Sequence, residues 1–132
     1  MIALDTNVLV RYLVEDDARQ TALAAALIER AIRDDQLLFI SDVVLCETVW
    51  VLSGAYRFAQ AQIAAVVRDL LRAKHLAFSV PDQLTRAHAA YAAGKGDFAD
   101  YLVREHARSA GCDEVATFDK VLLKERGFTA PK

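Results

Sequence analysis

Proline, glycine and cysteine are scarce in this sequence. The 132 residues include two prolines and five glycines, so no flexible linker divides the chain and we expect one domain spanning residues 1–132. The two cysteines, Cys46 and Cys112, form neither a metal-type pair nor a disulfide framework. This usage favours a protein of the reducing cytoplasm.

Long apolar runs and an excess of charge of one sign are also absent. The longest apolar stretch, residues 43–52, contains Glu47 and Thr48 and falls short of the roughly 18 residues that a membrane span requires. The first residues lack the basic start of a signal peptide. With 16 Lys and Arg against 18 Asp and Glu, coating of nucleic acid through bulk charge is disfavoured, whereas a local nucleic-acid site is not excluded.

Short apolar segments alternate with longer amphipathic ones along a chain that is 55% hydrophobic. The short segments predict strands, and the longer ones, with apolar residues at helical spacing, predict helices. Because parallel strands need crossover helices, we expect an α/β fold, a three-layer α/β/α sandwich with a parallel sheet of four to five strands. The expected strands lie at residues 1–4, 37–40, 76–80, 114–117 and 128–129, and the expected helices at about 8–14, 16–33, 42–55, 60–74, from 81, 97–109 and from 119.

Two acidic residues closely follow expected strands. Asp5 comes directly after the first strand, and Asp119 lies two residues beyond the strand that ends at Thr117. In open parallel sheets ligands bind outside the carboxyl ends of the strands, where two such carboxylates can converge. The simpler interpretation is that each acid caps the following helix, which stabilises a helix by about 0.5–2 kcal/mol.

Glu47 has only apolar neighbours at three and four residues' distance in an expected helix. A helix that is apolar all round is normally buried, and a buried carboxylate must be paired, protonated or bound to a metal. An ion pair with Arg11 is the alternative to a metal. The apolar neighbours are Val43, Val44, Trp50 and Val51.

Asp97 and Asp100 open the helix that follows the glycines at positions 94 and 96. Acids in the first turn complement the helix dipole, by about 0.3–1 kcal/mol. Asp100 can also pair with Arg104 one turn later. Their positions alone therefore do not indicate a functional site.

As a set, acids from four elements can be brought to one edge of a parallel α/β fold. Carboxylates that share a pocket raise one another's pKa unless a cation is present, and Mg²⁺ accepts such oxygen ligands. Two ions about 3.5–4 Å apart can hold the attacking and leaving oxygens of a phosphodiester displacement. The four candidate catalytic and metal-binding residues are Asp5, Glu47, Asp100 and Asp119.

Other catalytic patterns are weak or missing. The three histidines have no metal spacing, and neither a phosphate-binding glycine loop nor a nucleophile elbow is present. Some basic residues near the acids are candidates for holding a phosphate backbone, although solvated helix faces explain them equally well. They are Lys95, Arg104 and Lys120, with Arg108 and Lys124.

Four motifs, in order, resemble those of the PIN-domain ribonucleases, and specifically the VapC-type toxins of bacterial toxin–antitoxin pairs. The resemblance spans essentially the whole chain, and the four motifs together are more specific than any one alone. They are IALDTN at residues 2–7, SDVVLCE with WVL at 41–47 and 50–52, GDFADYL at 96–102, and ATFD at 116–119.

The resemblance implies a three-layer α/β fold with an acidic Mg²⁺ or Mn²⁺ site that cuts RNA endonucleolytically. It further implies a homodimer, and a cognate antitoxin whose tail lies in a groove near the acids. By their positions in the motifs, the resemblance implies four acids of the site, one additional acid and two polar residues that support the site. These are Asp5, Glu47, Asp100 and Asp119, then Asp97, then Asn7 and Thr117.

Three other functions remain as alternatives at this point. A phosphatase with an aspartyl nucleophile would need an acid where Asn7 stands. A signalling receiver domain would need a phosphoacceptor Asp after a middle strand, and residues 79–82 are a poor candidate. A non-catalytic PIN-like binding module would keep the fold and the partner groove without cutting RNA.

Overall fold

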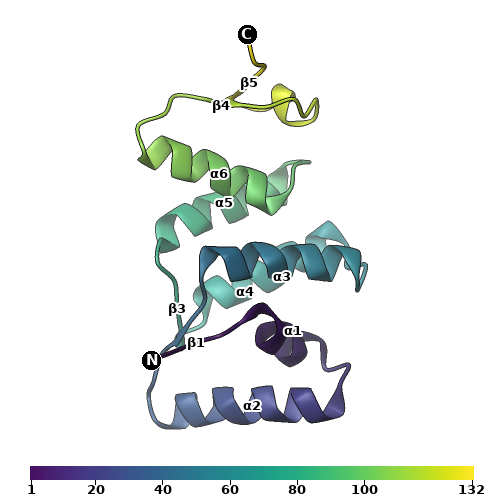
Figure 1. Ribbon diagram of the computed structural model, residues 1–132, viewed down its shortest axis with the longest axis vertical. Coiled ribbons are helices and arrows are strands. Elements are labelled where there is room, and N and C mark those ends of the chain that lie inside the picture. Colours follow the sequence, from purple (N-terminus) through teal and green to yellow (C-terminus); the bar gives the residue numbers. More distant parts are fainter. The chain divides into compact units, whose positions relative to one another are not determined.

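The computed structural model describes all residues, 1–132, and divides into two compact units. The first unit comprises residues 1–79 and the second comprises residues 80–132. Figure 1 labels the elements of both units. None of the α-helices combines the length and the apolar composition that crossing a bilayer requires.

The first unit is built from three short strands and four helices (Figure 1). The strands form one parallel sheet in the order β1-β2-β3, with Leu38 paired to Ile2 on one side and to Leu76 on the other. In chain order the elements are β1 (Ile2–Ala3), α1 (Thr6–Val14), α2 (Ala18–Arg33), β2 (Leu38–Phe39), α3 (Asp42–Gly54), α4 (Gln60–Arg72) and β3 (Leu76–Ala77).

Side chains just before α1, α2 and α3 decide where these helices begin. Asp5 accepts a hydrogen bond from the backbone N–H of Thr6 at the start of α1. Asp17 and Ser41 cap α2 and α3 in the same manner, through the N–H groups of Gln20 and Val44. Such caps satisfy backbone donors that have no partner within the helix, so they fix the helix start locally.

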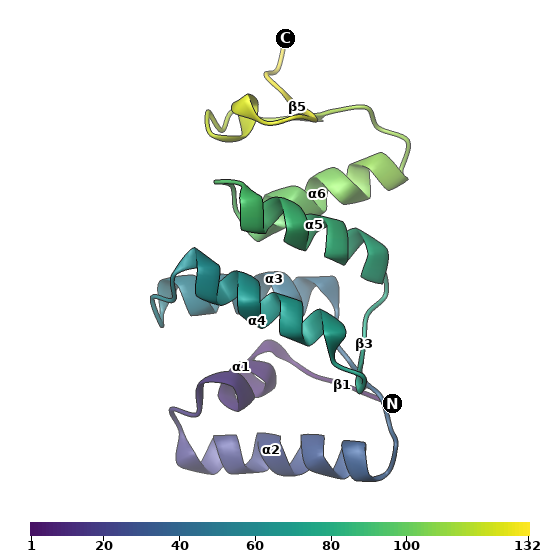
Figure 2. The ribbon, with the colours of Figure 1, turned by 180° about the vertical axis from the view of Figure 1, so that it is seen from behind.

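Apolar side chains of this unit are buried on both sides of its sheet. Leu4, Ile28, Ala31 and Leu38 form one buried cluster between the sheet and α2. Helix α3 lies beside α4, as Figures 1 and 2 both show, and the two helices contact each other. Each fully buried apolar side chain of these two helices stabilises the fold by about 1.5–3 kcal/mol. These side chains are Leu45, Val49 and Leu52 of α3 with Ile63 and Val67 of α4.

The second unit is a helical hairpin followed by a two-stranded parallel sheet. The rings of Tyr91 and Phe98, one from each helix, meet edge to face at 6.0 Å between centroids. The guanidinium of Arg104 lies over the rings of Tyr101 and Phe128, which joins the second helix to the last strand. The elements are α5 (Pro81–Ala93), α6 (Phe98–Ser109), β4 (Val115–Ala116), the 3₁₀ turn η1 (Leu122–Lys124) and β5 (Phe128–Thr129).

The α/β class and the parallel pairing predicted from the sequence are confirmed, and every expected helix except the last is present. Hydrogen-bonded pairing occurs within each unit, among three strands in the first and two in the second. The strands are two residues long, shorter than the apolar runs suggested. The helix expected from Asp119 is a single 3₁₀ turn that begins only at Leu122.

Candidate functional site

Asp5 lies where β1 turns into α1. Its carboxylate is exposed, and Oδ1 accepts the N–H of Thr6 at 2.8 Å. The capping interpretation is therefore correct for Asp5. This bond uses one of the two carboxylate oxygens of an exposed residue.

Glu47 lies on α3 and is connected to the Asp5 turn through one hydroxyl. The buried Thr6 donates a hydrogen bond from Oγ1 to Glu47 Oε1 at 3.2 Å. Thr6 thus contacts both acids of the first unit, Asp5 through its backbone N–H and Glu47 through its side chain. Sequence reasoning missed Thr6, although a hydroxyl directly after the first motif acid was visible in the sequence.

The expectation that Glu47 is buried was wrong. Glu47 is exposed, as are Val43 and Trp50 on the same face of α3, at 67% and 52%. An apolar composition does not bury every face of a helix when its partners cover only some of them. The expected alternative partner, Arg11, is not paired with Glu47 but forms an ion pair with Asp16 at 3.0 Å.

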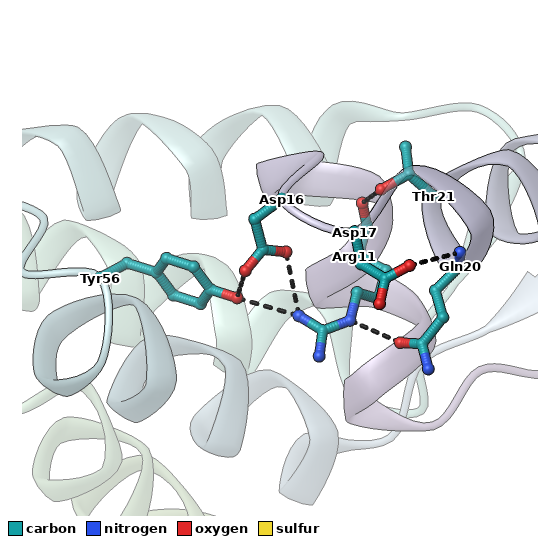
Figure 3. Close-up of polar contacts among 6 residues, drawn as sticks. All are labelled: Arg11, Asp16, Asp17, Gln20, Thr21 and Tyr56. Atoms are coloured by element: carbon teal, nitrogen blue, oxygen red, sulfur yellow. Dashed lines mark hydrogen bonds and ion pairs between the residues drawn. The ribbon is translucent and has the colours of Figure 1, made fainter.

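Arg11 is the centre of a separate polar network (Figure 3). Its guanidinium donates to Asp16, to the hydroxyl of Tyr56 at 3.0 Å and to Gln20 at 2.6 Å. Tyr56 in turn donates to Asp16 at 2.6 Å, and this bond is the main reason that the pKa of Asp16 lies below its ordinary value. The network joins α1, the start of α2 and the residues after α3, so its role is structural.

Asp97 and Asp100 form a reciprocal cap at the start of α6. Asp97 accepts the N–H of Phe98 at 2.8 Å, and Asp100 Oδ2 accepts the N–H of Asp97 at 3.1 Å. Arg104, the expected partner of Asp100, instead donates to the carbonyl of Arg126 at 2.7 Å. Backbone N–H groups therefore contact both acids, and Arg104 is directed to another partner.

Asp119 is held by the short turn that follows β4. Its Oδ1 accepts the N–H of Val121 at 2.8 Å, and its own N–H donates to Thr117 Oγ1 at 3.0 Å. Thr117, a residue that the resemblance marks as supporting, thus fixes the backbone from which Asp119 projects. Lys120, next in the chain, is exposed.

The acids of the second unit are close enough to disturb one another's ionisation. Partial burial raises the pKa of Asp100, and the charges of Asp97, Asp119 and Glu125 raise it further. A hydrogen bond from the backbone of Asp97 partly offsets these effects. A carboxylate disfavoured by burial and by neighbouring negative charge is one that a bound cation would stabilise.

The donor chemistry of both units suits a hard cation. The candidate side chains offer carboxylate oxygens only, the ligands that Mg²⁺ and Mn²⁺ accept. Neither unit by itself gathers three or more His, Cys, Asp or Glu side chains in an arrangement that could hold a metal ion. Asp5 and Glu47 belong to the first unit and Asp100 and Asp119 to the second, so each unit supplies two of the four predicted acids.

Comparison with known proteins gives two findings. The PIN domain family matches residues 2–127 of the chain. Over 128 residues the chain is also 26% identical to a VapC ribonuclease of Aquifex aeolicus (strain VF5), a similarity that covers 97% of this chain and 93% of that protein. The match spans all four motifs and both units, and the chain therefore belongs to the PIN-domain family.

Proposed function

We propose that this protein is a metal-dependent endoribonuclease that hydrolyses RNA phosphodiester bonds and acts as the toxin of a toxin–antitoxin pair. One observation carries the proposal: the chain belongs to the PIN-domain family and has an acid at each of the four motif positions. The similarity to a VapC ribonuclease over nearly the whole of both proteins supports the toxin role. We further propose that residues 1–132 act as one nuclease domain.

The proposed metal ligands are Asp5, Glu47, Asp100 and Asp119, with Asp97 as an additional acid. Support comes from the pKa of Asp100, which partial burial and then the charges of Asp97 and Asp119 raise, since a divalent cation would stabilise the ionised carboxylate. A bound Mg²⁺ or Mn²⁺ lowers the pKa of water and stabilises negative charge on phosphate oxygens.

The chain's own residues supply positioning. Thr6 orients Glu47, and Thr117 orients the backbone of Asp119. Asn7 is exposed beside Asp5 at the start of α1, where its amide can hydrogen-bond to a phosphate or sugar oxygen. Lys95 and Lys120 are exposed, one directly next to each acidic motif of the second unit, and with Arg104 they are the proposed contacts to the RNA backbone.

The proposed partners are RNA, a cognate antitoxin and a second copy of the chain. A groove of about 320 Å³ between α1 and α2 supports a docking place for an antitoxin tail, because an exposed Leu23 lies beside polar Asn7 and Arg11. Asn7, which lines this groove, is two positions from Asp5 in the sequence. We propose a cytoplasmic location, in which the two free cysteines, Cys46 and Cys112, remain reduced.

Membership of the PIN-domain family removes the phosphatase and receiver alternatives. The non-catalytic binding module is separated from the enzyme by experiment. Purified protein is incubated with structured RNA in Mg²⁺, in Mn²⁺ and in EDTA, beside the variants Asp5→Asn and Glu47→Gln. Cleavage that needs the ion and is lost in both folded variants supports the proposal, whereas full cleavage in EDTA overturns it. Mapping of RNA 5′ ends after induced expression, with Asp5→Asn as reference, then identifies the substrate.

A further inference from the structure

A single buried hydroxyl joins two segments of the second unit. The side chain of Tyr101, on α6, is fully buried. Its oxygen accepts the backbone N–H of Gly96 at 2.8 Å, and its proton is directed to the carboxylate of Glu125, whose Oε2 lies at 2.6 Å. Tyr101 therefore ties the loop before α6 to the residue that follows η1.

Two glycines of the α5–α6 loop pack against this hydroxyl and carboxylate. A Cβ atom on Gly94 would overlap the Tyr101 hydroxyl and lie 2.6 Å from Glu125 Oε1. A Cβ on Gly96 would lie 2.7 Å from a methyl carbon of Leu122 and 3.0 Å from the Tyr101 hydroxyl. Both positions therefore require glycine, because a larger residue would collide with these neighbours. We call Gly94, Gly96, Tyr101 and Glu125 the tyrosine clamp.

The tyrosine clamp connects the first acidic motif of this unit, which contains Gly96 and Tyr101, to the segment that follows the second. On one side, Gly96 precedes Asp97, which caps α6 together with Asp100. On the other side, Glu125 ends the 3₁₀ turn that begins shortly after Asp119. The charge of Glu125 also contributes, after burial and the charges of Asp97 and Asp119, to the raised pKa of Asp100. The clamp is thus electrostatically close to the acids without containing one of them.

We propose that Glu125, acting through the hydroxyl of Tyr101, is a positioning residue that fixes the start of α6 relative to the Asp119 turn. This inference rests on the proposed function, in which Asp100 and Asp119 share a divalent cation. Glu125 acts through Tyr101 and is not itself a ligand. The hydrogen bond from the Tyr101 phenol to the partly buried carboxylate of Glu125 is charge-assisted, and partners that orient metal ligands strongly affect metal affinity.

Mn²⁺ affinity of the RNA-free protein, measured by electron paramagnetic resonance, tests the proposal without relying on activity. Tyr101→Phe removes the hydroxyl and keeps the ring, while Glu125→Ala removes its partner. Each variant is expected to weaken Mn²⁺ binding by about 10–100-fold, the range typical for loss of an orienting partner. The double variant is expected to bind no more weakly than either single variant, because both break the same contact. Glu125→Gln keeps an acceptor for Tyr101 and should recover most of the affinity.

Matched controls separate this contact from general effects. Tyr12→Phe removes an exposed hydroxyl in the first unit, and Glu114→Ala removes an exposed charge in the second. Both should bind Mn²⁺ as the wild type does. Thermal unfolding of each variant establishes that it is folded, and if Tyr101→Phe unfolds, the comparison of Glu125→Gln with Glu125→Ala decides the question.

Three results would overturn the inference. They are wild-type Mn²⁺ affinity in Tyr101→Phe and Glu125→Ala, a double-variant loss equal to the product of the single losses, or a Glu125→Gln variant as weak as Glu125→Ala. A wild-type protein that neither binds Mn²⁺ nor cuts RNA would instead remove the proposed function itself, so the two failures are distinguishable.

Discussion

Thr6 donates its side-chain hydroxyl to Glu47 at 3.2 Å while its backbone N–H donates to Asp5 at 2.8 Å. One buried residue therefore connects two proposed metal ligands that lie 42 positions apart in the sequence, at 5 and 47. The orientation of Glu47, which is exposed, depends on this contact more than on packing. Thr6 consequently acts as a hydrogen-bond donor to the site, a role that an ionised carboxylate cannot fill.

Removal of the Thr6 hydroxyl should impair the site and leave the fold intact. Thr6→Val has nearly the same shape but cannot donate to Glu47, so RNA cleavage is expected to fall by about 10–100-fold. Thr6→Ser retains the donor and should restore most of the rate. The measurement is the initial rate of RNA cleavage as a function of Mg²⁺ concentration.

Thr21→Val is the matched control for this prediction. Thr21 also donates its hydroxyl within the first unit, to the carbonyl of Arg11 at 3.0 Å, and this bond involves no proposed metal ligand. A cleavage rate equal to the wild type is expected for this variant. Equal losses in the Thr6 and Thr21 variants would mean that the effect is one of general stability.

Glu105 should be a main determinant of the stability of the second unit. Its carboxylate is 3% exposed and accepts Arg86 from α5 at 2.9 Å and Arg108 at 3.3 Å. Glu105→Ala should lower the free energy of unfolding by about 1–3 kcal/mol, less than for a fully buried pair because both arginines are largely solvated. Urea denaturation at neutral pH measures this change. Glu114→Ala, at an exposed position, should change it by less than about 0.5 kcal/mol.

The Tyr56–Asp16 hydrogen bond should give stability that depends on pH. Because the bond from Tyr56 lowers the pKa of Asp16, its contribution is present above the ordinary aspartate pKa of about 4 and is lost as the pH falls through the lower folded-state value. Tyr56→Phe should therefore be less stable than wild type at pH 7, with a difference that shrinks toward pH 2. Urea denaturation across this range measures it, and a difference that grows toward low pH contradicts the assignment.

Asp100→Asn should stabilise the metal-free protein. The asparagine oxygen can still accept the N–H of Asp97, while the charge that burial and neighbouring acids disfavour is removed. A gain in stability is expected in EDTA, kept small by solvent screening of the partly exposed carboxylate, with a loss of the extra stability that Mn²⁺ confers on the wild type. Thermal unfolding with and without Mn²⁺ tests both parts. Asp113→Asn, at an exposed position, is the control, and a destabilised Asp100→Asn in EDTA would refute the electrostatic argument.

Features encoded by neighbouring residues could be predicted from the sequence. The helix starts at Asp17, Ser41 and Asp97 depend on caps within a few residues, and all three were visible in the sequence. Gly111 follows α6 with a φ of 94°, a conformation that favours glycine, so the residue type itself marks the end of a helix. The family resemblance is likewise confirmed by the comparisons, since its motifs are contiguous segments.

Contacts between distant residues could not be predicted in this way. The Thr6–Glu47 bond spans 41 residues and the Tyr101–Glu125 bond spans 24, and no periodicity encodes either. The burial of Glu47 was predicted wrongly because composition alone does not tell which faces of α3 are covered. The convergence of all four acids on one cation stays a prediction.

Several proposed ligands also start secondary structure, because Asp5, Asp97 and Asp119 each accept a backbone N–H within two residues. Alanine at these positions would fray the local structure as well as remove the charge. Asparagine caps a helix about as well as aspartate and lacks the negative charge. Inactive protein for trapping uncut RNA or for co-crystallisation is therefore best made with asparagine, the one replacement that separates chemistry from folding at these positions.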